Sequence, residues 1–136
     1  MAKYPAFGTA LKKGGVAVAQ VKNISGPGLS LDTEDVTTHD STGGWEEVVA
    51  TILRSGTVTL EIAYDPNAAT HKYAAGGLLY DMVSRTANTY TLVFSSVPTV
   101  TWTFSALVTG FNPSAPAAGA LTATVTLKLT GQPTLV

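Results

Sequence analysis

Three residue types of a nucleophilic triad stand next to one another in this chain, as His39, Asp40 and Ser41. In a triad the serine attacks, the histidine takes its proton and the aspartate orients the histidine, so the three side chains must converge in space. Consecutive residues seldom converge in that way. We therefore interpret this segment as a polar loop, and we expect the protein not to be an enzyme.

Residue types that bind metal ions gather around the same loop. The oxygen and nitrogen ligands are Asp32, Glu34, Asp35, His39 and Asp40. They lack the D-x-D-x-D-G spacing of a calcium loop, and the chain has no cysteine for a thiolate site. Neither G-x-x-x-x-G-K-[ST] nor G-x-G-x-x-G, the loops that hold phosphates, is present. We expect no metal ion and no cofactor.

The composition points toward self-association. Charged residues make up 12% of the 136 residues, against about 25% in ordinary soluble domains. A surface with few charges does little to keep copies of a protein apart. The net charge of -1 gives no basic surface for tight nucleic-acid binding. The length fits one domain, and no apolar stretch is long enough for a secretory signal or a membrane helix.

Most of the chain alternates polar and apolar residues, which is typical of antiparallel strands with one buried face. The clearest strand is 57–64, in which Val58, Leu60 and Ile62 share one face. We expect 16–24 and 29–37 to pair as a hairpin across the turn at Gly26-Pro27-Gly28. Further strands are expected at 89–94, 100–108 and 121–131.

Two segments show helical spacing instead. The first has apolar residues at i, i+3, i+4, i+7 and i+8, which predicts a short helix. Its stripe either packs onto the sheet or docks on a neighbouring subunit, and it consists of Trp45, Val48, Val49, Ile52 and Leu53. The second covers 70–85, with Thr70 as a candidate N-cap and His71 at its start. Gly76-Gly77 inside it disfavours a helix, so either the helix begins later or another backbone approaches closely there. The predicted fold is mainly β, an antiparallel β-sandwich or partly open barrel with one or two short flanking α-helices.

Hydroxyl side chains line one face of two of the expected strands. This face consists of Thr57, Thr59, Glu61, Thr122, Thr124, Thr126 and Lys128. It is either the wet outer face of a sandwich or a smooth polar wall that lines a channel or contacts subunits. A wall with so few cations would bind a nucleic-acid duplex only weakly, because tight binding needs cations that neutralise phosphates.

Several segments, taken in order, resemble the major tail tube proteins of long-tailed, siphovirus-type bacteriophages. They are GTALKKGG, ISGPGLSLDTEDV, VTTHDSTGGWEEVVATILRSGTVTLEIAYDP and LTATVTLKLTG, and the resemblance extends from Gly8 to Leu135. It implies one tail-tube-like domain over 1–136, with an N-terminal arm (1–15), an extended loop (37–45) and a β-sandwich or small barrel flanked by a helix.

The resemblance also implies a function, which is to self-assemble into stacked, hexameric rings that form the conduit for DNA delivery. The implied partners are other copies of the chain, a tape-measure protein and the tail terminator and initiator proteins, with DNA only in passage and no membrane. The implied location is the virion tail, after assembly in the host cytoplasm. A monomeric decoration or binding module of a virion and an inner-tube protein of a secretion system are the alternatives.

The same resemblance assigns subunit contacts to the N-terminal arm and the extended loop. The candidate contact residues are Lys12, Lys13, Thr37, Thr38, His39, Asp40, Ser41 and Trp45. The two lysines are either a solvated pair or a contact with an acidic surface of a neighbouring subunit.

Overall fold

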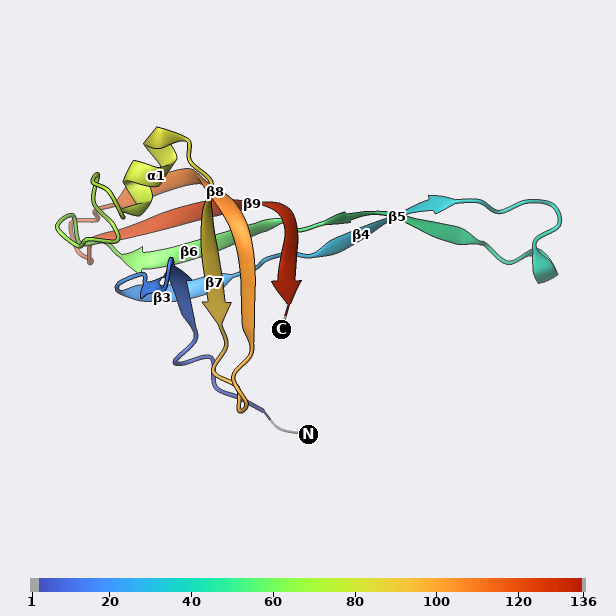
Figure 1. Ribbon diagram of the computed structural model, residues 1–136, viewed down its shortest axis with the longest axis horizontal. Helices are drawn as coiled ribbons and strands as arrows, with labels where there is room; N and C mark the ends of the chain where they lie inside the picture. The colour runs from blue at the N-terminus through green and yellow to red at the C-terminus, as the bar shows by residue number, and fades with distance from the viewer. Residues whose placement is uncertain (1–2, 136) are drawn as a thin grey trace.

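The computed structural model describes residues 3–135, and its main body is one bent, seven-stranded antiparallel sheet (Figure 1). The spatial order is β2-β1-β7-β8-β9-β6-β3, so the sheet begins and ends on different strands and is open. The strands are β1 (Ala10–Lys13), β2 (Val16–Ala17), β3 (Val21–Ser25), β6 (Thr57–Ala63), β7 (Asn88–Val93), β8 (Thr101–Ser114) and β9 (Thr122–Leu135). The predicted mainly β, antiparallel fold is confirmed.

The two longest strands, β8 and β9, bend the sheet over onto itself (Figure 1). Their pairing is irregular between Thr103 and Ser105 and again between Val108 and Gly110. Irregularities of this kind curve a strand and increase its twist. The strands β1 and β7 at one end of the sheet therefore share a core with β6 and β9 at the other.

Alternating apolar residues fill this core, as the sequence predicts for β6 and β9. The buried side chains are Val58, Leu60, Ile62, Ala123, Val125, Leu127 and Leu129 from those strands, and Leu11, Tyr90, Leu92, Phe104 and Ala106 from the others. Burial of each large aliphatic or aromatic side chain contributes about 1.5–3 kcal/mol. This apolar layer holds the bent sheet together, and the sequence has no cysteine that could add a disulfide.

Residues 30–54 form a separate two-stranded hairpin, β4 (Ser30–Asp35) paired with β5 (Val48–Arg54). This hairpin is hereafter called the arm, and it is distinct from the N-terminal segment 1–15. The predicted hairpin of 16–24 with 29–37 is wrong, because β3 pairs with β6 instead. The predicted helix over 45–53 is also wrong. Apolar residues at helical spacing form a helix only where a surface covers their stripe, whereas every residue of β5 is exposed. The β-branched residues of β5 favour an extended chain paired with β4.

The helix predicted within 70–85 begins only after Gly76-Gly77, as α1 (Leu78–Ser84), and its N-cap is Gly77 rather than Thr70. A Cβ added at Gly77 would lie 1.8 Å from the backbone oxygen of Lys72, so only glycine allows this close approach. The segment before α1 is therefore a compact turn, and α1 packs against β8.

His71 lies in this turn and is fully buried. Its Nε2 lies 2.7 Å from the carbonyl oxygen of Ala19, while its Nδ1 accepts a hydrogen bond from the Asp65 backbone N–H at 3.3 Å. Because the carbonyl only accepts and the N–H only donates, the ring is the neutral tautomer protonated on Nε2. Thr70 adds a third link by accepting from the Ala19 N–H at 3.1 Å. His71 thus fastens the turn to the segment before β3, which corrects its predicted role as a helix-start residue.

Replacing His71 with phenylalanine should lower the free energy of unfolding by about 1–3 kcal/mol. The variant keeps an aromatic ring of similar size but leaves the Ala19 carbonyl and the Asp65 N–H without their partner. Urea denaturation of the purified subunit measures the change. The matched control is His39→Phe at an exposed position of the arm, for which we expect no loss. Equal stability of the two variants would contradict the fastening role.

Candidate assembly surfaces

The arm projects away from the sheet, and both of its faces are open (Figure 1). Its apolar side chains are between 46% and 79% exposed at Leu31, Val48, Val49, Ile52 and Leu53. A two-stranded hairpin is marginally stable in water by itself. Large apolar side chains exposed on both faces of such a ribbon mark it as an interaction site. The arm is therefore a candidate surface for contact with a neighbouring subunit.

Residues 36–47, which connect β4 to β5, form the tip of the arm. Side-chain hydrogen bonds hold this tip in a defined shape. Ser41 is buried there; its hydroxyl donates to Glu47 Oε2 at 2.8 Å and accepts from the Thr38 backbone N–H at 3.0 Å. Thr37 Oγ1 accepts from the Glu47 backbone N–H at 2.8 Å. Hydrogen bonds from Thr37, through its side chain and its backbone N–H, lower the pKa of the Asp35 carboxyl. These polar groups turn the chain at the tip and tie its two sides together.

Trp45 stands at this tip and is 78% exposed. It follows the short 3₁₀ turn η1 (Thr42–Gly44), in which Gly43 has a φ of 66°. A Cβ at Gly43 would lie 3.1 Å from the indole ring, so the glycine lets the ring rest close to the backbone. Of the two alternatives for Trp45, packing of a helix onto the sheet is wrong, because no helix forms and the ring faces solvent. Contact with a neighbouring subunit stays a prediction.

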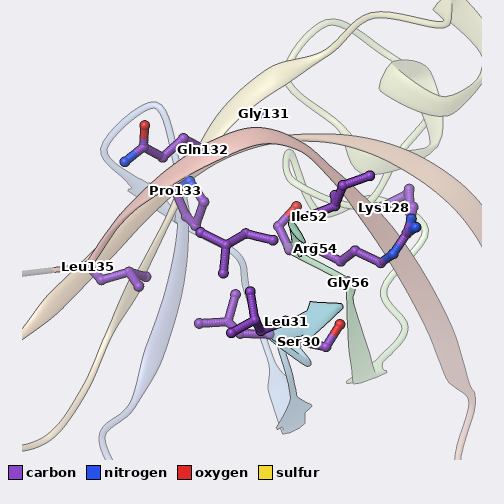
Figure 2. Close-up of a pocket in the computed structure, with 13 residues that line it drawn as sticks. Ser30, Leu31, Ile52, Arg54, Gly56, Lys128, Gly131, Gln132, Pro133 and Leu135 are labelled. Carbon is purple, nitrogen blue, oxygen red and sulfur yellow. The ribbon is translucent and has the colours of Figure 1, made fainter. Parts of the chain in front are cut away.

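A groove of about 950 Å³ lies at the opposite end of the arm, under the bent end of β9 (Figure 2). Leu31 and Ile52 line it from the arm, and Pro133 and Leu135 line it from β9. Lys128 stands at its border with the main sheet. This groove is not visible in the sequence, because it joins residues about a hundred positions apart.

The polar residues predicted to share a face are brought together by the pairing of β6 with β9. Thr57 lies opposite Lys128, Thr59 opposite Thr126 and Glu61 opposite Thr124, and Thr122 continues the row. Their apolar neighbours on both strands point into the core. Glu61 has one cationic partner, Lys22, at 3.8 Å. The seven residues therefore form one continuous polar face, hereafter the hydroxyl face.

The two adjacent lysines have different surroundings. Lys13 forms an ion pair with Asp81 of α1, and their side chains are only 15% and 6% exposed. The Tyr90 hydroxyl donates to the same carboxylate at 3.5 Å, and burial together with the charge of Asp81 raises the pKa of Tyr90 above its usual range. Lys13 is thus engaged within the chain, and we leave it out of the contact surface. Lys12, on the other side of β1, remains a candidate.

The residue types that suggested chemistry do not assemble a site. The Ser41 hydroxyl bonds to Glu47 rather than to His39, and His39 and Asp40 are both exposed. Within residues 3–135, no three acidic, histidine or cysteine side chains lie close enough to hold a metal ion. In the same part of the chain, no helix has the length and apolarity needed to cross a membrane.

An open sheet, an unburied apolar arm and a continuous hydroxyl face are the features of a structural subunit that is completed by its neighbours. Residues 6–136 match the family model described as lambda phage tail tube protein, TTP. The chain belongs to this family, which confirms the resemblance seen in the sequence. It is a structural protein of a phage-type tail tube and a component of the virion tail.

Solved structures share the fold at low sequence identity. One is from the virion of a native gene transfer agent particle, with a TM-score of 0.79 and 13% identity over 98% of this chain and 99% of that chain. Another is from the sheath/tube terminator of an extracellular contractile injection system (PVC) in the extended state, with a TM-score of 0.74 and 18% identity over 100% and 98%. The sheath-tube complex of that system gives 0.70 and 18% over 98% and 93%. No curated protein matches the sequence significantly.

Proposed function

We propose that this chain assembles into stacked, hexameric rings that form a tail tube around a tape-measure protein, and that the tube conducts DNA. The observation that carries the proposal is the arm, whose apolar side chains find no cover within the subunit. Membership of the tail tube family supports the ring arrangement. In this proposal terminator and initiator proteins close the two ends, and assembly takes place in the host cytoplasm.

The proposed subunit contacts lie on the arm, the N-terminal segment and the sheet edges. At the tip they are Thr37, Thr38, His39, Asp40, Ser41 and Trp45. Near the N-terminus they are Phe7, which is 94% exposed, and Lys12, which is half-buried. β3 and β2 end the sheet, and unpaired edge strands invite pairing with another chain. Ring closure would cover both edges and the arm at once.

The hydroxyl face is the proposed wall of the bore. Its side chains are mostly threonines, and Glu61 is balanced by Lys22. Each phosphate that a cation neutralises adds salt-dependent affinity, and several such contacts bind DNA tightly. The other cation of this face, Lys128, lies at the end of the row beside the groove. The rest of the wall would therefore stay wet and let the duplex slide.

Negative-stain electron microscopy of the purified protein across a concentration series tests the assembly. We expect hollow tubes or rings, with their share rising with concentration. A protein that stays monomeric at every concentration and forms neither would overturn the proposed function.

Two arginines on the hydroxyl face should make the tube hold DNA inside. Thr59→Arg and Thr126→Arg change two residues that lie opposite one another. Tubes assembled from this double variant with short duplex DNA should retain it and shield it from nuclease. Retention should weaken steeply as the salt concentration rises. A plot of the logarithm of the DNA affinity against the logarithm of the salt concentration becomes steeper by about 0.9 for each phosphate neutralised.

The matched control for this experiment is Ser84→Arg with Thr86→Arg, which adds the same charge at exposed positions near α1. Its DNA should bind outside the tube and be digested. Equal nuclease sensitivity of the DNA on both variants would show that the hydroxyl face does not line the bore.

A further inference from the structure

The arm carries an unburied apolar surface at each end, the tip at Trp45 and the groove at its base. Trp45 lies nine positions before Arg54, which lines the groove, and most of the chain between them is the extended strand β5. At about 3.3 Å per residue the two ends lie roughly 30 Å apart. The tip therefore cannot reach the groove of its own chain, although it can reach that of another copy.

The two ends also carry opposite charge. Asp35, Asp40, Glu46 and Glu47 lie at or beside the tip, and no lysine or arginine occurs between residues 35 and 47. The groove is lined by Arg54 and Lys128 and by no carboxylate. Charges arranged in this way favour tip-to-groove contact and disfavour contact between two tips.

Of the two cations that line the groove, Lys128 is the one available to a carboxylate of another subunit. Arg54 already pairs with Asp32, at 2.7 Å between Nε and Oδ2. Within residues 3–135, no carboxylate lies within 4.0 Å of Lys128. On the tip, Glu47 is engaged by Ser41, while Glu46, which follows Trp45 in the sequence, is exposed. Glu46 and Lys128 are thus the complementary pair at the edge of an apolar contact.

The tip is also built to bind with little loss of entropy. Its hydrogen bonds hold Thr37, Thr38, Ser41 and Glu47 in place before any contact is made. Binding by a preorganised group loses less conformational freedom. Tryptophan is one of the residue types enriched among the side chains that contribute most to binding at protein interfaces, where it fills a pocket of the partner.

We propose that the tip of the arm docks into the base groove of a second copy of this chain, with Trp45 in the groove and Glu46 beside Lys128. The contact joins two different surfaces, so each copy can bind one neighbour through its tip and a second neighbour through its groove. Such heterologous contacts generate rings or open filaments rather than closed dimers. The inference rests on the proposed self-assembly and specifies which surfaces meet.

Cross-linking at two introduced cysteines tests this pairing, because the native chain has none. Thr42→Cys marks the tip and Gln132→Cys marks the groove, and both positions are exposed. With a short bis-maleimide, the assembled double variant should give a ladder of dimers, trimers and larger species on a denaturing gel. The matched control pairs Thr42→Cys with Val83→Cys on α1, which is 49% exposed and outside the groove.

A charge exchange gives a second readout. Glu46→Lys and Lys128→Glu should each raise the concentration needed for assembly about tenfold, and the two together should bring it back toward the wild-type value. Tubes seen by microscopy with no more ladder than the control would overturn the docking while leaving the proposed function intact. Absence of both tubes and ladder at every concentration would overturn both.

Discussion

Replacing Trp45 with alanine should abolish tube formation and leave the isolated subunit as stable as the wild type. The indole is 78% exposed, and every residue of β5, which follows it, is exposed as well. Its removal therefore takes away almost no contact within the subunit. A tryptophan that anchors an interface costs about 2 kcal/mol or more when truncated, which is a loss of about 30-fold in affinity at each contact. Because a tube repeats the contact many times, the assembly should fail altogether.

Thermal melting and sedimentation on the same preparation separate the two effects. The melting temperature of the monomer should be unchanged, while no species larger than a monomer should sediment. The matched control is Trp102→Ala, because Trp102 is partly buried and packs edge-on against Phe94, with 5.1 Å between the ring centroids. That variant should melt at a lower temperature. A destabilised Trp45→Ala subunit that still forms tubes would contradict our assignment of Trp45.

Removing the positive charge of Lys13 should be among the most damaging single changes to the stability of the subunit. Lys13→Met leaves the Asp81 carboxylate, which is 6% exposed, without its cation. Leaving one partner of a buried ion pair uncompensated costs about 3–5 kcal/mol. The loss should fall on the packing of α1 against the sheet, because the pair joins α1 to β1.

A second substitution should recover much of that stability. Asp81→Asn removes the unpaired charge and keeps an oxygen that accepts from the Tyr90 hydroxyl. Lys13→Met with Asp81→Asn should therefore unfold at a higher urea concentration than Lys13→Met alone. The surface pair Lys22–Glu61 is the control, since its side chains are about half exposed, and breaking it with Lys22→Met should cost less than about 1 kcal/mol. Similar losses for Lys13→Met and Lys22→Met would mean that burial does not strengthen the Lys13 pair.

Alternating patterns by themselves determined the centre of the fold. In 57–64 and 121–131 every second residue is apolar, and each of those apolar positions from 58 to 62 and from 123 to 129 is buried. The pairing register of a strand with one solvent-exposed face is strongly specified, because a shift of one residue would turn all of its apolar side chains toward solvent. The same pattern identified the hydroxyl face, and the order of short segments identified the tail tube family.

The tertiary structure alone decided what the chain does with 45–54. WEEVVATILR carries both a helical stripe and the β-branched residues of a strand, so local preference does not choose between them. The choice depends on a partner: β4 lies alongside, whereas no sheet lies beneath to cover a helical stripe. Long-range packing likewise paired Lys13 with Asp81 and fastened His71 to Ala19. Such contacts join residues far apart in the chain, and only the folded backbone brings them within reach of one another.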